Sequence, residues 1–262
     1  MSCFTRALTS TAKSKFLSPS NRNLLATALA GMVLFGTNVS ASVITHEFNN
    51  GESLSSWTVD RAAPSSFSIV GNELVMSIDG TNFPDSRGAF YDTKGMQLDI
   101  GQSNYLSVDM YVDSSWIGNE RFAGMWGVGR DASDSISAFP ILEFQGAGSN
   151  GPDAGINVWD NSGWQGKSNL FNYDAFNTLE LMITGSGIEY YLNSNLLHTD
   201  SSSNTSHLSA VILNAKNDGN SFDVRYDNLQ YGRVSVPEPS TLALMGLGLS
   251  GLVVARRRKA HA

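Results

Sequence analysis

The acidic residues are the first side chains of this chain that could do chemistry. Hydrolysis of a glycosidic bond uses two carboxyl groups, and the retaining reaction places them ~5–5.5 Å apart, a separation that alternate residues of one strand can provide. Glu143, in the segment PILEFQG, has no acidic neighbour at that spacing. Asp109 and Asp113 would share a strand face, but four residues separate them by roughly 13 Å. We therefore interpret these acids as a solvated strand face or as ligand contacts, and expect no catalytic pair.

Nucleophile–base sets are also missing from the sequence pattern. No serine lies in a Gly-x-Ser-x-Gly segment, and the residues after position 41 include three histidines before the C-terminal tail: His46, His198 and His207. His198 and His207 lie nine residues apart in the segment HTDSSSNTSH, which we predict to be a loop. Zinc sites use a spacing of three to five residues or pair histidines with cysteines. The chain is therefore predicted not to be an enzyme.

Aromatic side chains on polar strand faces are the signal for ligand binding. Sugar rings pack on aromatic faces, while amide and carboxylate groups take the hydroxyls. Asn157 and Trp159 would share one strand face, with Glu143 on an adjacent strand; the alternative is that Trp126 and Trp159 fill the core. The candidate ligand-binding residues are Asp109, Tyr111, Trp126, Glu143, Asn157 and Trp159. Trp116 and Trp164 are expected in loops.

The elements that would position these residues are strands. In YLSVDMYVD, NTLELMIT and GIEYYLN, apolar residues alternate with polar ones, and Gly, Asn, Asp and Ser turns separate the segments. Such a pattern, without a long run of period 3.6, is typical of β structure. Further strands are predicted at 43–48, 67–70, 73–78, 88–91, 96–100, 122–128, 139–144, 155–159, 208–213 and 221–231. Residues 42–233 are thus predicted to form one all-β domain, an antiparallel β-sandwich of two sheets.

Three segments of this domain resemble the concanavalin A-like and laminin-G-like jelly rolls: HEFNNGESLSSWTV, NTLELMITGSGIEYYLNSNLL and FDVRYDNLQYG. Laminarinase-type members carry a Glu-x-Asp-x-x-Glu run, which is absent here. In carbohydrate-binding members a structural Ca²⁺ often joins the first strand to the last. The resemblance therefore implies a possible calcium site at Glu47 and Asp227, and oxygen ligands in an acidic domain suit that ion. The alternative is that Asp227 bonds a neighbouring turn and no ion is present.

Charge excludes one class of partner. Residues 42–237 hold nine basic residues against 23 acidic ones, a net charge of −14. Such a surface repels phosphate backbones, so we expect no nucleic-acid partner.

The two ends of the chain indicate export. Residues 1–41 have the layout of a signal peptide: a basic start, an apolar helix at 24–35 and small residues before a cleavage point after Ala41. At the other end, Pro237 and Pro239 fix an extended segment. Fifteen apolar or small residues, 241–255, then cover only about 22 Å as a transmembrane helix. Arg256, Arg257, Arg258 and Lys259 follow and would remain cytoplasmic.

This tail, residues 234–262, resembles the PEP-CTERM sorting signal of Gram-negative, exopolysaccharide-producing bacteria. Its motif is Val236, Pro237, Glu238 and Pro239. The resemblance implies that an exosortase, a membrane-embedded cysteine peptidase, processes the protein after transient residence in the inner membrane. The mature protein would then be periplasmic, at the outer surface or in the extracellular matrix.

We expect an exported protein that binds glycan, with the cell's own exopolysaccharide in a biofilm matrix as the ligand. Two alternatives stay open: a structural matrix protein without a specific ligand, and a divergent glycoside hydrolase.

Overall fold

Residues 42–146, 155–166 and 169–235 are described by the computed structural model. All of them belong to one compact unit, Val39–Ala262. The predicted signal helix and the C-terminal transmembrane helix lie outside the described residues. Within the described ranges, no helix is long and apolar enough to cross a membrane.

Two antiparallel sheets of eight strands each make up the fold, so the predicted all-β sandwich is confirmed. The first sheet has the order β14-β13-β12-β6-β16-β4-β3, and β1 pairs with β16. Its strands are β1 (Ser42–His46), β3 (Ser66–Val70), β4 (Glu73–Ile78), β6 (Tyr105–Val112), β12 (Ala175–Thr184), β13 (Gly187–Leu192), β14 (Asn195–Asp200) and β16 (Phe222–Arg233).

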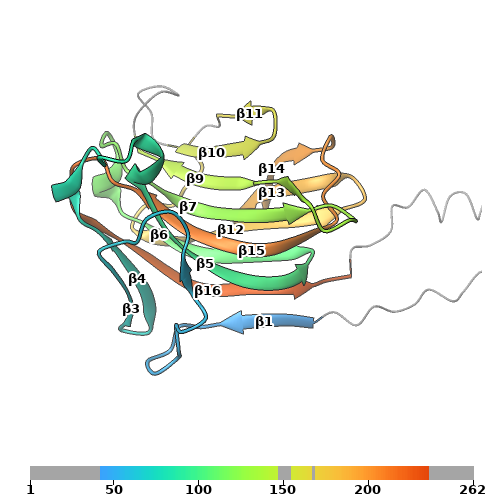
Figure 1. Cartoon of the computed structure of the whole chain (residues 1–262), viewed down its shortest axis with the longest axis horizontal. Coiled ribbons are helices and arrows are strands. Elements are labelled where there is room, and N and C mark those ends of the chain that lie inside the picture. The colour runs from blue at the N-terminus through green and yellow to red at the C-terminus, as the bar shows by residue number, and fades with distance from the viewer. Residues whose placement is uncertain (1–41, 147–154, 167–168, 236–262) are drawn as a thin grey trace, which may run out of the picture. The chain divides into compact units, whose positions relative to one another are not determined.

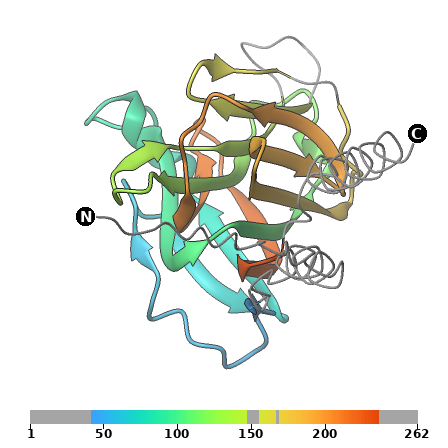
Figure 2. The ribbon, with the colours of Figure 1, turned by 90° about the vertical axis from the view of Figure 1, so that its right-hand side faces the viewer.

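The second sheet has the order β11-β10-β9-β7-β15-β5-β2, and β8 pairs with β7. Its strands are β2 (Thr58–Val59), β5 (Thr93–Ser103), β7 (Phe122–Arg130), β8 (Ile136–Ala138), β9 (Ile141–Gln145), β10 (Gly155–Asp160), β11 (Gly163–Trp164) and β15 (His207–Lys216). From top to bottom, Figure 1 shows β10, β9, β7, β15 and β5 in this order. Figure 2 shows the same strands after a quarter turn.

The core lies between the sheets because alternate residues of each strand turn inward. In β4 and β13 every second residue is buried, which matches the apolar alternation of their sequences. One hydrophobic cluster joins Leu106, Met110 and Tyr226 of the first sheet to Met125 and Phe144 of the second. A second, small cluster of Val128, Ala210 and Ile212, with Trp126 packed on it, lies on the outer face of the second sheet.

Short 3-10 helices occupy three connections: η2 (Gly80–Asn82), η3 (Ala89–Asp92) and η4 (Ser114–Trp116). The strand predicted at 88–91 is therefore wrong. Gly88 has a φ of 109°, which turns the chain out of an extended path. The buried carboxylate of Asp92 accepts the backbone N–H of Asp85, and this contact holds the loop closed.

The loop predicted around His198 is also wrong, because His198 lies in β14 and His207 begins β15. Five of the six β14 residues remain partly or fully accessible, as expected at a sheet edge, so its apolar alternation is weak.

Candidate functional site

Glu143 lies at the centre of a polar row that crosses the outer face of the second sheet. Leu142 and Phe144 point into the core, so Glu143 points the opposite way. In the strand register Glu143 pairs with Asn157 of β10 on one side and with Gly124 of β7 on the other. Gly124 in turn pairs with Asn214 of β15. Four strands thus bring a carboxyl and two amides into one row.

The glycine in this row leaves room for a contact between its neighbours. A Cβ at Gly124 would lie 2.1 Å from the carbonyl oxygen of Leu142 and 2.7 Å from the Cα of Glu143, so only glycine fits. Across this gap the Asn214 Nδ2 donates to Glu143 Oε2 at 3.3 Å. Asn157 Nδ2 donates to Gln145 Oε1 at 3.1 Å beside it.

Tyr226 holds the backbone of this row from the core side of the sheet. It comes from β16 of the first sheet, is fully buried, and its hydroxyl lies 2.9 Å from the carbonyl of Gly124 and 3.1 Å from that of Asn214. A single O–H shared between two carbonyls ties β7 to β15 at the level of Glu143. Burial and the nearby Glu143 carboxyl both raise the pKa of Tyr226, so the hydroxyl remains a donor.

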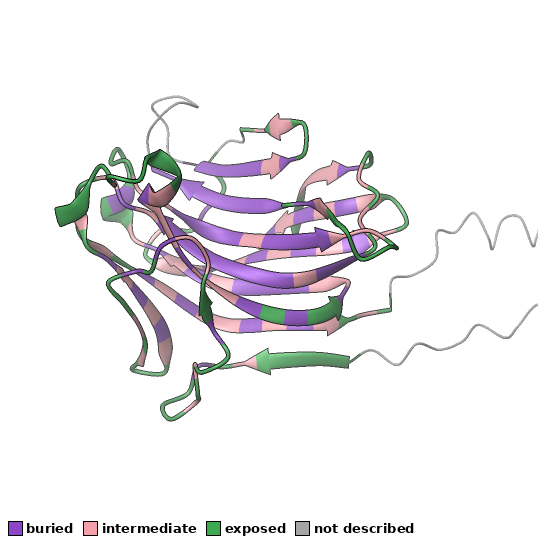
Figure 3. Ribbon diagram, in the orientation of Figure 1, coloured by how far each residue is buried: buried purple, intermediate pink, exposed green. Residues whose placement is uncertain are grey.

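Burial changes the acidity of Glu143. Its side chain and those of Asn157 and Gln145 are buried although they face away from the core, and Figure 3 shows β9 buried along its length. Desolvation raises the pKa of Glu143 to about 7; the hydrogen bond from Asn214 and the charges of Lys216 and Arg61 oppose that rise only in part. Glu143 therefore holds its proton up to neutral pH.

Arg61 reaches over this face from the loop that follows β2. The loop is held against β5 by two backbone hydrogen bonds, from Asp60 N to Gly95 O and from Gly95 N to Ala62 O. The Arg61 guanidinium stacks 3.9 Å from the Trp126 ring and 5.0 Å from the ring of Phe90. Its Nε lies 2.6 Å from Asp60 Oδ2.

A pocket of about 330 Å³ opens at this face. It is lined by Arg61, Phe90, Trp126, Glu143, Gln145 and Asn157, together with Phe122, Trp164 and Lys216. Two aromatic rings at the pocket are exposed: Phe90 by 63% and Trp164 by 42%. Several buried polar atoms have no hydrogen-bond partner, although such atoms are normally satisfied. Those in the pocket lining and the polar row include Arg61 Nη2, Trp126 Nε1, Asn157 Oδ1 and Asn214 Oδ1. A mixed aromatic and polar lining of this kind suits a hydroxyl-rich ligand.

The predicted ligand-binding residues divide between the two faces of the sandwich. Trp126, Glu143 and Asn157 meet in the pocket, and Trp159 packs against Trp164 with ring centroids 5.3 Å apart. Neither Trp126 nor Trp159 lies in the main core.

Asp109 and Tyr111 lie on the outer face of the first sheet, so grouping them with Glu143 is wrong. Asp109 accepts hydrogen bonds from Thr178 and Asn228, and the Tyr111 ring lies 4.1 Å beneath the Arg225 guanidinium. Both residues lie in β6, which belongs to the first sheet. The alternation of polar and apolar residues within a strand does not reveal to which sheet the strand belongs. Trp116 is not in an open loop but is buried against Phe144.

Of the two predicted calcium residues, Asp227 lies in β16 of the first sheet and Glu47 comes directly after β1, near enough for their charges to interact. Asp227 pairs directly with Asp109 across β16 and β6. Burial raises the pKa of Asp227, and the charges of Asp109, Glu73 and Glu47 add to that rise. In the part of the chain that the structure covers, no group of three or more His, Cys, Asp or Glu side chains could hold a metal ion. Calcium at Glu47 and Asp227 stays a prediction.

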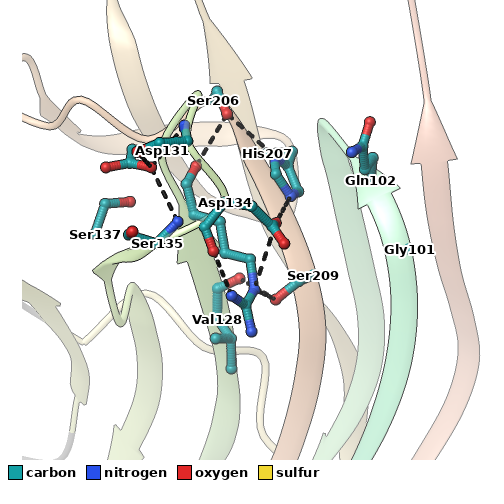
Figure 4. Close-up of polar contacts among 12 residues, drawn as sticks. Gly101, Gln102, Val128, Asp131, Asp134, Ser135, Ser137, Ser206, His207 and Ser209 are labelled. Atoms are coloured by element: carbon teal, nitrogen blue, oxygen red, sulfur yellow. Dashed lines mark hydrogen bonds and ion pairs between the residues drawn. The ribbon is translucent and has the colours of Figure 1, made fainter.

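A second polar cluster surrounds His207 at the start of β15 (Figure 4). The His207 Nδ1 lies 3.0 Å from Ser206 Oγ and its Nε2 lies 3.3 Å from Asp134 Oδ1. The Ser206 hydroxyl donates to the carbonyl of Arg130, so its proton does not point to the imidazole as in a hydrolase triad. Asp134 is 71% exposed, and we interpret the cluster as a fastening of the 131–135 loop.

A larger pocket of about 560 Å³ lies at the 79–94 loops, but the two cations in its lining, Arg87 and Lys94, are already paired. Asp85 accepts from both Arg87 and Lys94. That pocket has no aromatic lining, whereas the Glu143 pocket has both rings and unpaired polar atoms.

Arg61, Asn214, Lys216 and Phe90 were not identified from the sequence. Each comes from a segment far from β9 in the chain, so only the register of the sheet brings it to Glu143. One available signal was Gly124, the first of three glycines within the strand FAGMWGVGR, since glycine inside a strand often marks a close backbone approach.

The sorting tail and the fold both have counterparts among known proteins. Residues 235–259 match the PEP-CTERM protein-sorting motif, which confirms the tail predicted from Pro237, Glu238 and Pro239. The motif indicates export and processing by an exosortase. No curated protein sequence matches the chain.

Solved structures of similar fold include a Bacillus licheniformis β-glucanase (TM-score 0.51, 13% identity, 74% of this chain and 100% of that chain). A β-1,3-1,4-glucanase (lichenase) from a mouse hindgut metagenome matches with a TM-score of 0.51 at 12% identity, over 74% and 100% of the two chains. A laminarinase from Flavobacterium sp. UMI-01 matches with a TM-score of 0.53 at 10% identity, over 72% and 98%. The jelly-roll resemblance is thus confirmed as a resemblance of fold.

The same likenesses correct one prediction. The sequence led us to expect a protein that is not an enzyme, yet the structures that share its fold are glycoside hydrolases. We withdraw that expectation. The likeness itself establishes the fold and not a reaction.

Proposed function

We propose that this chain is an exported, exosortase-processed protein that binds a polysaccharide in the Glu143 pocket, on the outer face of its second sheet. Residues 1–41 would be the signal peptide, 42–233 the binding domain and 234–262 the removable sorting signal. The natural ligand in this proposal is the exopolysaccharide of the surface on which the protein is retained. The matched sorting motif supports the export.

The observation that carries the binding proposal is the combination of groups around Glu143. A carboxyl that stays protonated can donate a hydrogen bond to a sugar oxygen, and the amides of Asn157 and Asn214 each leave an acceptor without a partner. The exposed rings of Phe90 and Trp164 offer apolar faces on which a sugar ring can pack. Together they provide both kinds of contact that sugar binding uses.

Cleavage of the bound polysaccharide is the second candidate function, and the acidity of Glu143 favours it. A general acid for glycoside cleavage needs a raised pKa so that it carries a proton near neutral pH. Burial raises the pKa of Glu143 to about 7. Hydrolysis also needs a second carboxylate, and among the described residues that line the pocket Glu143 is the only acid.

A glycan array probed with the purified protein tests the proposal. Trp164→Ala should weaken binding at least several-fold because it removes an exposed stacking ring from the pocket. Leu196→Ala is the control, since Leu196 is 55% exposed on β14 of the other sheet. Equal binding by the Trp164 and Leu196 variants would contradict the site, and an array without any bound glycan would favour a structural matrix protein.

Reducing-sugar release from each bound glycan separates the two candidates. Glu143→Gln keeps the size of the side chain and its ability to accept from Asn214, but cannot donate a proton to a leaving group. If the protein cleaves its ligand, this variant should still bind and lose release. Release that persists in Glu143→Gln would exclude Glu143 as the acid.

A further inference from the structure

Two cations border the Glu143 pocket of an otherwise acidic domain. The surrounding residues 42–237 carry a net charge of −14. Arg61 and Lys216 nevertheless both line this pocket, and Glu143, its acid, is largely neutral below pH 7. The local charge of the pocket is therefore positive.

Lys216 is one of the few cations without a carboxylate partner. Within the described ranges, the other basic side chains except Arg233 lie within 4 Å of an acidic group. The Lys216 ammonium instead lies 4.9 Å from the centre of the Phe122 ring. Its position at the end of β15 places it two residues from Asn214, on the same face of the sheet.

Arg61 has the second unused donor. Its side chain is only 7% exposed and its Nη2 has no hydrogen-bond partner, whereas the Asp60 carboxylate lies at the Nε edge of the guanidinium. Burial lowers the pKa of Arg61, and the charges of Asp60 and Glu143 oppose that change. A guanidinium stays protonated even so, and its fork binds carboxylate or sulfate oxygens well.

We propose that the pocket recognises a sugar unit with an anionic substituent, a carboxylate or a sulfate, through Arg61 and Lys216. This inference rests on the proposed function and narrows its ligand to acidic polysaccharides. The two cations would bind the anionic group, while Glu143 and Asn157 would contact the hydroxyls. Because a neutral glucan offers no anionic group, it would leave the Lys216 ammonium without a counter-charge and the Arg61 Nη2 without a charged partner.

Isothermal titration of the purified full chain at pH 6 tests the proposal with matched ligands. The probes are hexagalacturonate, its fully methyl-esterified form, a sulfated galactan hexasaccharide and laminarihexaose. Hexagalacturonate and the ester share the same sugar chain and differ at the carboxyl groups, which the ester makes neutral by adding a methyl group, so the protein should bind the acid at least tenfold more tightly. A preference for the sulfated probe over the uronate would identify sulfate as the anionic group.

Lys216→Gln should remove most of that preference, roughly tenfold in Kd for the anionic probe, and should leave the ester unaffected. Arg233→Gln is the control because it makes the same charge change at a second unpaired cation, which bonds Gln102 away from the pocket. Arg61→Gln should cause a larger loss of affinity for the anionic probe. Because Arg61 is buried, this variant could fail to fold, and in that case Lys216→Gln alone decides whether the cations bind the anionic group.

Equal affinity for the acid and its ester would overturn this inference and leave the glycan site intact. Tight binding of laminarihexaose, without binding of any anionic probe, would also overturn the inference that the pocket recognises an anionic sugar. An absence of binding to every probe, together with an empty glycan array, would overturn the proposed function as well.

Discussion

At the scale of single residues, two carboxyl groups are held in the structure against their preference for water. Glu143 is buried among amides and aromatic rings, and Asp227 faces the like charge of Asp109 across two strands. The pKa of each is raised. Each group therefore reduces the stability of the fold when it is ionised, a cost that natural proteins accept where a group has a function.

Glu143→Gln should make the protein more stable at pH 8. The pKa of Glu143 is raised from 4.5 to about 7 in the folded state, so its contribution to stability is present below pH 4.5 and is lost as the pH rises through 7. The variant removes this loss and should gain about 3 kcal/mol in the free energy of unfolding at pH 8. Urea unfolding at pH 4 and pH 8 measures it, and a variant less stable than the parent at pH 8 would contradict the buried acid.

Asp227→Asn should stabilise the protein at pH 7 by ~0.5 kcal/mol, because it removes a like charge opposite Asp109 on a partly exposed face. Asparagine can still accept the backbone N–H of Asn228, as Asp227 does. The gain should vanish in acid, because the raised pKa of Asp227 means that this carboxyl takes up its proton early as the pH falls.

A bound calcium ion would reverse the effect of Asp227→Asn. In that case the variant would lose stability and EDTA would lower the Tm of the parent protein. A Tm unmoved by EDTA would remove the calcium prediction for Glu47 and Asp227.

The sequence identified those site residues that stand out from the alternation of their own strand. Asn157, Glu143 and Trp126 were identified because polar or aromatic residues alternate with apolar ones within β10, β9 and β7. Arg61 and Lys216 reach the same pocket through pairing with β5 and β7, which no local pattern encodes. Asp109 and Tyr111 were grouped wrongly for the same reason, since alternation assigns a face but not a sheet.

At the scale of elements, the close approach of β7 and β9 shapes the site. Gly124 lets the backbone of β9 approach and leaves the gap through which Asn214 contacts Glu143. The strands themselves were largely predictable because both sheets bury one face against a common core. The strand predicted at 88–91 is wrong for a local reason. Gly88 has a positive φ, which the apolar residues of this segment do not reveal.

Gly124→Ala should destabilise the fold by at least ~2 kcal/mol, because its Cβ would overlap the backbone of Leu142 and Glu143. The Asn214–Glu143 contact and glycan binding should weaken with it. Gly185→Ala is the control, since a Cβ there meets nothing within 4 Å. Equal unfolding midpoints for the two variants in urea would contradict the close packing of β7 on β9.

At the scale of the whole molecule, the sorting motif and the β-sandwich domain occupy separate parts of the sequence. The sorting motif at 235–259 follows directly after β16, the last strand of the sandwich. The tail could be recognised from sequence because its information is local and ordered along the chain. The ligand site could not be recognised as completely, because the fold assembles it from six strands and from the two connections that carry Arg61 and Phe90.

Pro237→Ala combined with Glu238→Ala should block processing by the exosortase. The variant should accumulate as an uncleaved form in the inner membrane fraction, because the Pro-Glu-Pro motif is removed while the apolar segment remains. Intact mass of the mature protein and immunoblots of cell fractions measure this. Ser240→Ala serves as the control beside the motif, and an unchanged mature mass in the double variant would exclude exosortase recognition of these residues.

Glycan binding on the outer face of the second sheet, at Glu143, is tested most directly by NMR of the labelled protein with a glycan that it binds. We predict shift changes at the side-chain amides of Asn157 and Asn214 and at the indoles of Trp126 and Trp164. Shift changes centred on Asp109 and Tyr111, with the Glu143 row unmoved, would contradict it.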